Sequence, residues 1–405
     1  MLPPLHAPEK LLKEPYDYAI IGSGITGVSI AHNLLKANPK SRILMIEARD
    51  LCSGATGRNG GHTKAASYRT YLQHKAELGK EEALRIARLE YATIVETHAL
   101  AKELNLECES HLCNTVDIIY DAATFAQGKA AIEALIEDAT EEERKHSGMA
   151  DYKIYTDASE ITQKFHVQRT NTNPSIPQTG KGSEQIHGAF EYLAGRIHAY
   201  HFTTSLLTHL ASTHPTLHIL THTPVTSLTA SPSSTPDNPL WTLQTSTHAA
   251  NIKAHTTLLA TNAYTPYLAP TFQSLIVPLR GQITAQSTPH SPLENTYSFI
   301  HASGYDYMIP RPSSGHVVIG GALSRLPSSG AEEYGTVDDS RVNPVISSYL
   351  RESLNGFFGT EEGKRHEVVH EWTGIMGATG DGRPFVGEGG DANGPGRILI
   401  VMTLA

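Results

Sequence analysis

The chain has 405 residues, of which 39% are hydrophobic and 18% charged, and its formal net charge is −9. This length allows a large buried core or two to three domains. The charge balance, without a long Lys/Arg run, argues against a nucleic-acid partner, because binding to the phosphate backbone needs clustered cations. The longest apolar stretch is too short to span a bilayer, so no membrane partner is expected.

The cysteine content and the amino terminus indicate the compartment. Cys52, Cys108 and Cys113 are too few and too irregularly spaced for a disulfide framework or a zinc site, and are expected to remain thiols. Residues 1–16 contain prolines and charges but no apolar signal core. We therefore predict a soluble cytoplasmic protein.

The first elements of the chain predict a βαβ unit. Tyr16–Ile21 is an expected buried strand, Ile25–Ala37 an expected helix, and residues 42–46 a second strand. Asn38-Pro39 ends the helix, because a residue before proline is pushed out of the helical region. This order is typical of a Rossmann-type dinucleotide-binding fold.

The turn between the first strand and the helix, GSGITG at residues 22–27, fits the pattern of a pyrophosphate-binding loop. Gly22 allows the tight turn, Gly24 lets the backbone approach the pyrophosphate, and Gly27 permits close helix packing. The helix amino terminus adds N–H groups and a partial positive charge. Glu47 follows Gly27 by 20 residues and is expected to accept hydrogen bonds from the adenosine ribose. The turn therefore predicts a dinucleotide cofactor.

The segment after Glu47 favours FAD over NAD. Residues 53–62 read SGATGRNGGH, a run of small residues with one cation, Arg58. An NAD enzyme needs no such loop after its ribose-binding acid. A flavin enzyme needs backbone to pass close to the pyrophosphate and the flavin ring, with Arg58 and Asn59 as polar contacts. A flexible surface loop is the alternative interpretation.

The remainder of the chain is helical at first and then rich in strands. Residues 68–105 are expected to be helical with a break at Gly79, and a loop is expected near 171–182. Further strands are expected at 114–120, 186–192, 217–220, 225–230, 241–246, 249–254, 256–260, 281–286, 305–309, 316–320 and 396–402, and further helices at 122–139, 200–212 and 341–358.

The combination of IIGSGITG, Glu47 and SGATGRNGGH resembles the D-amino-acid-oxidase-type (DAO) family of FAD-dependent oxidoreductases, and within it the gamma-glutamylputrescine-oxidase-like branch. Other segments resemble the family in the same order along nearly the whole chain. They are GAF at 188–190 leading to Gly195, LLATNA at 258–263, VPLRGQ at 277–282, residues 305–311 with 318–321, and WTG at 372–374 with DGRP at 381–384.

The resemblance implies an α/β fold. A Rossmann-type FAD-binding domain of the glutathione-reductase type is expected from residues 1–66, 183–265 and 371–405. An interleaved mixed-sheet α+β substrate domain is expected from residues 67–182 and 266–370. The residues expected to bind FAD are Gly22, Ser23, Gly24, Ile25, Thr26, Gly27, Glu47, Ala48, Ser53, Thr56, Arg58, Asn59, Gly60, Gly61, Val225, Thr261 and Gly382.

The resemblance also implies a reaction. A C–N bond of a small amine or amino-acid-like substrate is oxidised by hydride transfer to flavin N5, and O2 is expected to reoxidise the flavin to give H2O2. Arg311 is the expected partner of a substrate carboxylate, with a structural salt bridge as the alternative. Tyr305 and Tyr307 share a strand face and could wall the pocket or pack the sheet. His62 should lie near the flavin, where a covalent link is an open alternative.

A zinc site is the rival hypothesis, because residues 366–370 read HEVVH and match HExxH. Zinc binding through this motif needs a helix, whereas its two valines and the following WTG predict a strand with His366 and His370 on one side. His214, His218 and His222 are also four residues apart, but Pro215 and Pro224 prevent one continuous helix. We predict no metal.

The carboxyl terminus departs from the family pattern. The chain stops at Thr403-Leu404-Ala405, before the glycine-rich turn and final helix that resemblance to the family would lead one to expect. That helix would direct its amino terminus at the flavin. A truncated, weakly active or inactive flavin-fold protein is therefore the alternative function, and weak or substoichiometric FAD is expected in the purified protein.

Overall fold

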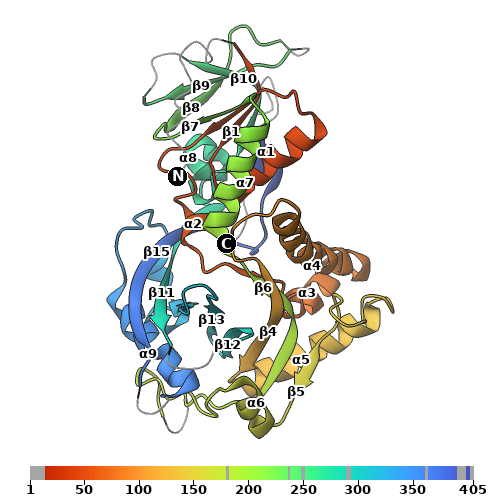
Figure 1. Ribbon diagram of the computed structural model, residues 1–405, viewed down its shortest axis with the longest axis vertical. Helices are drawn as coiled ribbons and strands as arrows, with labels where there is room; N and C mark the ends of the chain where they lie inside the picture. Colours follow the sequence, from red (N-terminus) through yellow and green to blue (C-terminus); the bar gives the residue numbers. More distant parts are fainter. Residues whose placement is uncertain are drawn as a thin grey trace.

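The computed structural model describes residues 14–178, 182–235, 238–247, 251–288, 293–360, 364–389 and 398–401. Its strands form two sheets, which lie in the two lobes seen in Figure 1. The expectations for residues 1–13, 249–250, 396–397 and 402–405 lie outside the described residues.

The first sheet is the expected dinucleotide-binding sheet. Its order is β16-β17-β10-β1-β2-β7, with β9 pairing with β10 and β8. The pairs from β17 through β7 are parallel, and all four residues of β2 are buried, as in a sheet covered on both faces. The strands are β1 (Tyr16–Ile21), β2 (Ile43–Ile46), β7 (Leu217–Leu220), β8 (Val225–Ala230), β9 (Trp241–Thr245), β10 (Ile252–Leu259), β16 (Val386–Gly389) and β17 (Ile398–Val401).

The second sheet is mixed and larger. Its order is β15-β11-β14-β13-β12-β4-β6-β3, with β5 pairing with β6. The β4–β12 pair is parallel and the other pairs are antiparallel. The strands are β3 (His62–Lys64), β4 (His111–Ile119), β5 (Lys153–Tyr155), β6 (Gly188–Arg196), β11 (Ile276–Ser287), β12 (Thr296–His301), β13 (Gly304–Pro310), β14 (Val317–Gly320) and β15 (Glu367–Thr379).

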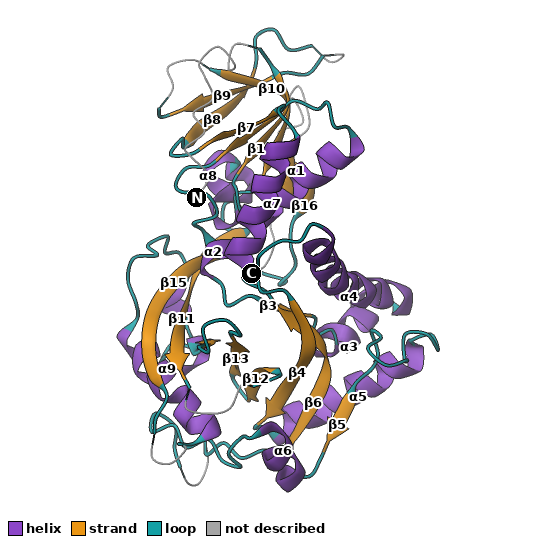
Figure 2. Ribbon diagram, viewed as in Figure 1, coloured by secondary structure: helices purple, strands orange, loops and turns teal. Residues whose placement is uncertain are grey.

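The helices cover both sheets. In the first lobe α1 and α7 lie side by side, and their apolar faces share one core with β1 and β2. In the second lobe α3, α4 and α5 lie outside β4 and β6, and α9 lies against β11 and β15 (Figure 2). The helices are α1 (Ile25–Ala37), α2 (Ala55–Arg58), α3 (Tyr68–Leu78), α4 (Lys80–Glu103), α5 (Ala122–Asp138), α6 (Ala158–Phe165), α7 (Ala199–Thr213), α8 (Thr265–Leu268) and α9 (Pro344–Phe358).

The expected fold class is confirmed, with corrections to individual segments. The expected break at Gly79 separates α3 from α4, where Gly79 has φ +86°. The two strands expected at 249–254 and 256–260 are one strand, β10, and β12 was not expected.

Three strands from the expected FAD-binding segments join the second sheet, and the domain boundaries themselves stay a prediction. β3, β6 and residues 371–379 of β15 were expected in the FAD-binding domain, but all belong to the second sheet. The pattern of apolar residues in a segment predicts a buried strand. The sheet that this strand joins depends on pairing partners far away in the sequence.

Candidate active site

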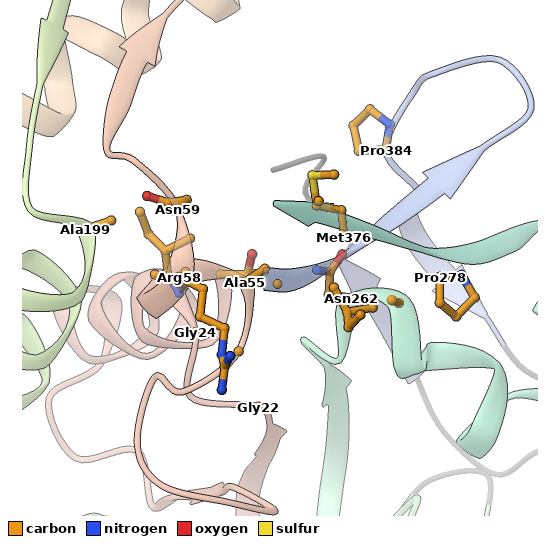
Figure 3. Close-up of a pocket in the computed structure, with 18 of the residues that line it drawn as sticks. Gly22, Gly24, Ala55, Arg58, Asn59, Ala199, Asn262, Pro278, Met376 and Pro384 are labelled. Atoms are coloured by element: carbon orange, nitrogen blue, oxygen red, sulfur yellow. Dashed lines mark hydrogen bonds between the residues drawn. The ribbon is translucent and has the colours of Figure 1, made fainter. Parts of the chain in front are cut away.

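A cavity of about 2140 Å³ lies between the two sheets. It opens at the carboxyl ends of β1 and β2, where open α/β sheets bind their ligands. Figure 3 shows Gly22, Gly24 and Arg58 on one side of this cavity and Asn262 and Met376 on the other. Residues of both lobes therefore contribute to one site.

Two glycines of the turn after β1 are required by its geometry. Gly22 has φ +108°, and a Cβ added there would lie 2.4 Å from the carbonyl oxygen of Ala260. A Cβ added at Gly27 would lie 2.0 Å from the carbonyl oxygen of Gly22. Gly22 thus turns the chain from β1 into α1 close to the end of β10, and Gly27 brings α1 against the turn, as expected.

The amino terminus of α1 fits an anionic group. Its N-cap residue, Gly24, provides no side-chain cap, and the first turn holds no acidic residue. Gly24, Ile25 and Thr26 line the cavity, so the backbone of this turn and its partial positive charge face the space where a pyrophosphate is expected.

Glu47 is held in place at the end of β2. Its Oε2 accepts hydrogen bonds from the Ser23 backbone N (3.1 Å) and Ser23 Oγ (2.7 Å), and its Oε1 accepts one from the backbone N of Arg49. These contacts join the glycine turn to β2 and orient the carboxylate along the cavity wall. Its expected contact with ribose hydroxyls stays a prediction.

The small-residue loop approaches the second sheet closely. A Cβ at Gly60 would lie 2.8 Å from Ile309 Cδ1, and one at Gly61, where φ is +78°, would lie 1.8 Å from the Ile197 carbonyl oxygen. The arginine of this loop is already engaged by protein groups. Arg58 donates to the carbonyls of Ser53 and Thr373, at 2.8 and 3.0 Å. It therefore joins the loop to β15 as well as lining the cavity.

Most of the predicted site residues line the cavity. They are Gly22, Ser23, Gly24, Ile25, Thr26, Glu47, Ala48, Thr56, Arg58, Asn59, Gly60, Gly61, His62, Val225, Thr261, Tyr305 and Tyr307. Gly27, Ser53, Gly382 and Arg311 do not line it. Gly27 acts in helix packing, and Ser53 supports Arg58 through its carbonyl.

Arg311 is not placed to meet a substrate. Its Nη2 lies 2.6 Å from Glu109 Oε2, and its Nη1 donates to the Ile197 carbonyl at 2.8 Å. The expectation that it lies in the pocket is wrong, and its alternative, a structural salt bridge, describes what the structure contains. Glu109 lies about two hundred residues earlier in the chain, so the strand carrying Arg311 could not reveal this partner.

A different arginine, Arg69 on α3, lines the cavity. Its guanidinium lies 4.2 Å from the ring centre of Tyr305, and no carboxylate of the described residues lies within ion-pair distance of it. Burial opposes its charge, but Tyr68, Tyr305 and Asp117 together hold its pKa above the usual value. The sequence analysis missed Arg69, because nothing in the helical pattern of residues 68–78 distinguishes it from a surface arginine.

Tyr305 and Tyr307 lie on the cavity face of β13, as their spacing predicts. Tyr305 is 44% exposed, whereas burial raises the pKa of Tyr307 and keeps its phenol neutral. A Cβ at Gly320 would lie 2.5 Å from Tyr307 Oη, so the lack of a side chain there makes room for the ring. These tyrosines therefore form part of the cavity wall.

Asp306 lies between these tyrosines and faces the opposite, buried side. Its carboxylate accepts hydrogen bonds from Ala322 N (2.9 Å) and Tyr349 Oη (2.6 Å). Burial raises its pKa to about 6, against the partial effect of Arg325. A carboxyl group whose pKa is higher in the folded than in the unfolded state stabilises the fold at pH values below the unfolded-state pKa. This stabilisation is lost as the pH rises through the folded-state pKa.

We therefore expect Asp306→Asn to flatten the pH dependence of stability. The free energy of unfolding of the wild type, minus that of the variant, should fall by up to about 3 kcal/mol between about pH 4 and 7. Chemical denaturation at several pH values measures it. A difference that stays constant, or that rises with pH, would contradict the assignment.

His62 lies at the start of β3 and lines the cavity. Its Nε2 lies 2.7 Å from Thr296 Oγ1. Burial is the main cause that lowers the pKa of His62 well below its usual value. The positive charge of the nearby Lys64 lowers it further, so the ring is neutral. A neutral imidazole is held here as a hydrogen-bonding group.

Lys64 brings a second cation to the cavity, but this one is paired. It donates to the buried carboxylate of Asp117 and to Ser298 Oγ, the latter at 2.7 Å. Tyr68 and Tyr192 each donate to the other oxygen of Asp117 at 2.8 Å. Burial lowers the pKa of Lys64, and Asp117 partly opposes this. The pair neutralises Lys64, whereas Arg69 lines the same cavity without an ion-pair partner in the described part of the chain.

The HExxH motif lies on a strand, as the sequence analysis predicted. β15 begins at Glu367, which excludes the helical arrangement that zinc needs. A β-bulge opposite Ala285 and Gln286 breaks the alternation of side chains, so His366 is buried and His370 exposed. The expected placement of both histidines on one side is therefore wrong. In the described part of the chain, no three His, Cys, Asp or Glu side chains group as a metal site.

Comparison with known proteins assigns the chain to a family. The family described as FAD dependent oxidoreductase (DAO) matches residues 17–402. The chain belongs to the DAO family. FAD is accordingly its cofactor, and the amino terminus of α1, the closely packed glycines of the turn and Glu47 fit the pyrophosphate and adenosine of FAD. A comparison with curated proteins finds no match.

Solved structures show where the same fold occurs. Glycine oxidase from Geobacillus kaustophilus is 18% identical with a TM-score of 0.68, over 96% of this chain and 89% of that chain. L-proline dehydrogenase from P. horikoshii is 16% identical with a TM-score of 0.68, over 96% and 88%. L-α-glycerophosphate oxidase from Mycoplasma pneumoniae, with FAD bound, is 13% identical with a TM-score of 0.66, over 96% and 89%. These structures share the fold of this chain and differ in the substrates for which they are named.

The described residues set limits on two further expectations for this DAO protein. No helix among them is long and apolar enough to cross a bilayer. The expected departure from the family pattern at the carboxyl terminus concerns residues 402–405, which lie outside the described residues.

Proposed function

We propose that this DAO-family enzyme oxidises the C–N bond of an amino-acid-like substrate whose carboxylate is bound by Arg69. The observation that carries the proposal is the Arg69 guanidinium, which faces the cavity without an ion-pair partner among the described residues. A guanidinium binds a carboxylate bidentately, and the Tyr305 ring keeps its plane in a fixed orientation. FAD supplies an acceptor for the hydride at flavin N5, and O2 is the proposed final acceptor, giving H2O2.

The side chains of the site are suited to orienting the substrate rather than to transferring protons to or from it. Arg69 would bind the carboxylate of the substrate, and Tyr305 and Tyr307 would enclose its side chain. His62, held neutral and hydrogen-bonded to Thr296, would meet the substrate without adding a charge. Loss of a hydride to the flavin from the carbon next to an uncharged amine nitrogen would leave an iminium cation, which gives its N–H proton to water and becomes an imine. Water would then hydrolyse the imine to a carbonyl product and a free amine or ammonia.

Two finer assignments belong to the same proposal. The SGATGRNGGH loop supports a place in the gamma-glutamylputrescine-oxidase-like branch. The three cysteines, all free, support action in the reducing cytoplasm.

A substrate panel under anaerobic conditions tests the proposal. The FAD-loaded protein is mixed with amino acids, with amines that lack a carboxylate, and with 2-hydroxy acids and glycerol phosphate, and bleaching of the flavin absorbance is followed. We expect bleaching by at least one amino acid, and peroxide on admitting air. Bleaching by the hydroxy compounds alone would contradict C–N oxidation, and bleaching by amines alone would contradict the role of Arg69.

A further inference from the structure

The segment at residues 336–341 leads from the second sheet to α9 and forms part of the cavity wall through Val337. Its backbone is attached to the second sheet. Arg280 on β11 donates to the Asp338 carbonyl at 3.2 Å, and Thr373 on β15 donates through Oγ1 to the Asp339 carbonyl at 3.0 Å. Arg58 of the FAD-binding loop also donates to the Asp339 carbonyl, through Nη1 at 3.2 Å, so the backbone of the segment contacts both lobes.

The side chain of Asp339 joins this segment to the FAD-binding loops. Its Oδ2 lies 2.8 Å from Arg49 Nη1 and 3.5 Å from Arg58 Nε, and its side chain is only 14% exposed. Arg49 follows Glu47 after β2, and Arg58 ends α2. One carboxylate of the second lobe thus meets two cations that come from opposite ends of the loop between β2 and β3.

This bridge lies beside the part of the cavity that fits adenosine. Tyr264 lines the cavity, and burial raises the pKa of its phenol. The positive charges of Arg49 and Arg58 oppose this rise, and the negative charges of Asp339 and Glu47 add to it. All four charges therefore lie within electrostatic reach of one phenol. Asp339 itself does not line the cavity, so it closes the wall without reaching the space for the cofactor.

We propose that segment 336–341 is a gate for FAD, held closed by the bridge from Asp339 to Arg49 and Arg58. The bridge joins protein groups only, so it stabilises the closed wall whether or not FAD is bound. Breaking the bridge lowers the barrier to opening of the segment, and it therefore speeds both the binding of FAD and its release. This distinguishes a gate from a contact with the cofactor, since loss of a contact would speed release alone.

The test measures both rates of FAD exchange by flavin fluorescence. Asp339→Asn is compared with the wild type for FAD binding to the apoprotein and for FAD release from the loaded protein. We expect both rates to rise by a similar factor, roughly three- to tenfold, because the ion pairs are partly exposed to solvent. The dissociation constant should stay within about twofold of the wild-type value.

Asp338→Asn is the matched control, because it removes the same charge from the neighbouring residue. Asp338 accepts a hydrogen bond from the backbone N of Ser340 (3.0 Å) and pairs with Arg341 (3.2 Å), both on the same loop. It makes no bridge to the FAD-binding loops, and both rates should stay at wild-type values. Equal acceleration in this control would overturn the proposal.

A double variant identifies the partner. Arg49→Gln alone should accelerate exchange, and adding it to Asp339→Asn should give little further change, because both remove the same pair. Faster release with unchanged binding, a lost affinity for FAD, or unchanged rates in Asp339→Asn would each overturn the gate. Asp339→Glu keeps the charge and should give rates between those of wild type and Asp339→Asn, and it serves as the test should the asparagine variant fail to fold.

Discussion

Replacing Gly22 by alanine is expected to weaken FAD binding by about a hundredfold. Two costs add, because Gly22 has φ +108° and an alanine Cβ would lie 2.4 Å from the Ala260 carbonyl oxygen. A strained backbone costs about 1–2 kcal/mol and the overpacking about 1–3 kcal/mol, together about 3 kcal/mol. This corresponds to about two powers of ten in a dissociation constant.

The Gly22 prediction is checked by titrating FAD into the apoprotein and following flavin fluorescence. Gly380→Ala is the matched control, because Gly380 has an ordinary φ and no heavy atom within 4 Å of an added Cβ. It should bind FAD as the wild type does. An affinity of Gly22→Ala within threefold of the wild-type value would show that the turn tolerates a side chain.

Replacing Arg69 by methionine is expected to lower kcat/KM for a carboxylate substrate by about a hundredfold. Methionine keeps much of the length of the side chain but removes the charge and the paired N–H groups. Truncating one partner of a charge pair costs about 2–5 kcal/mol, and exposure of Arg69 to the cavity places it at the lower end. Arg69→Lys should recover part of the loss, because an ammonium group keeps the charge without the planar fork.

Binding of a carboxylate that is not oxidised separates recognition from chemistry. Benzoate, a carboxylate without a C–N bond to oxidise, serves as the probe, and changes in flavin absorbance report its binding. We expect weaker benzoate binding in Arg69→Met with unchanged FAD content. Arg85→Met, on the exposed face of α4 where Arg85 pairs with Glu82, is the control. Equal losses with a carboxylate substrate and a plain amine would contradict the assignment.

The cofactor side of the site could be predicted from the sequence because its requirements are local. Gly22 and Gly27 are fixed by a backbone angle and by close approach within one turn. Glu47 is placed by the length of one βαβ unit, and its carboxylate accepts hydrogen bonds from Ser23 and from the backbone N of Arg49, both near it in the sequence. The alternation of Tyr305 and Tyr307 on β13 is likewise a local property of a strand.

The substrate side could not be predicted in the same way. Arg311 and Arg69 look alike as residues, and their difference depends on what each meets in space. Glu109 pairs with Arg311, whereas the carboxylate nearest to Arg69 in the sheet, Asp117, is already bonded to Lys64 and two tyrosines. Ion pairs join segments that are distant in sequence, so the pattern of either segment alone does not contain them.

The sequence by itself thus determined the dinucleotide-binding turn and most of the strands, because these follow from backbone conformation and hydrophobic periodicity. The DAO-type FAD enzyme was indicated only by the resemblance of its motifs to that family. Only the tertiary structure decided the sheet to which β6 and β15 belong, the cation that faces the cavity and the bridge from Asp339 to the FAD-binding loops. The physical reason is the same in each case. A strand pair, a filled ion pair and a cavity wall are each made by partners from separate parts of the chain, and their energies depend on distances that exist only in the folded protein.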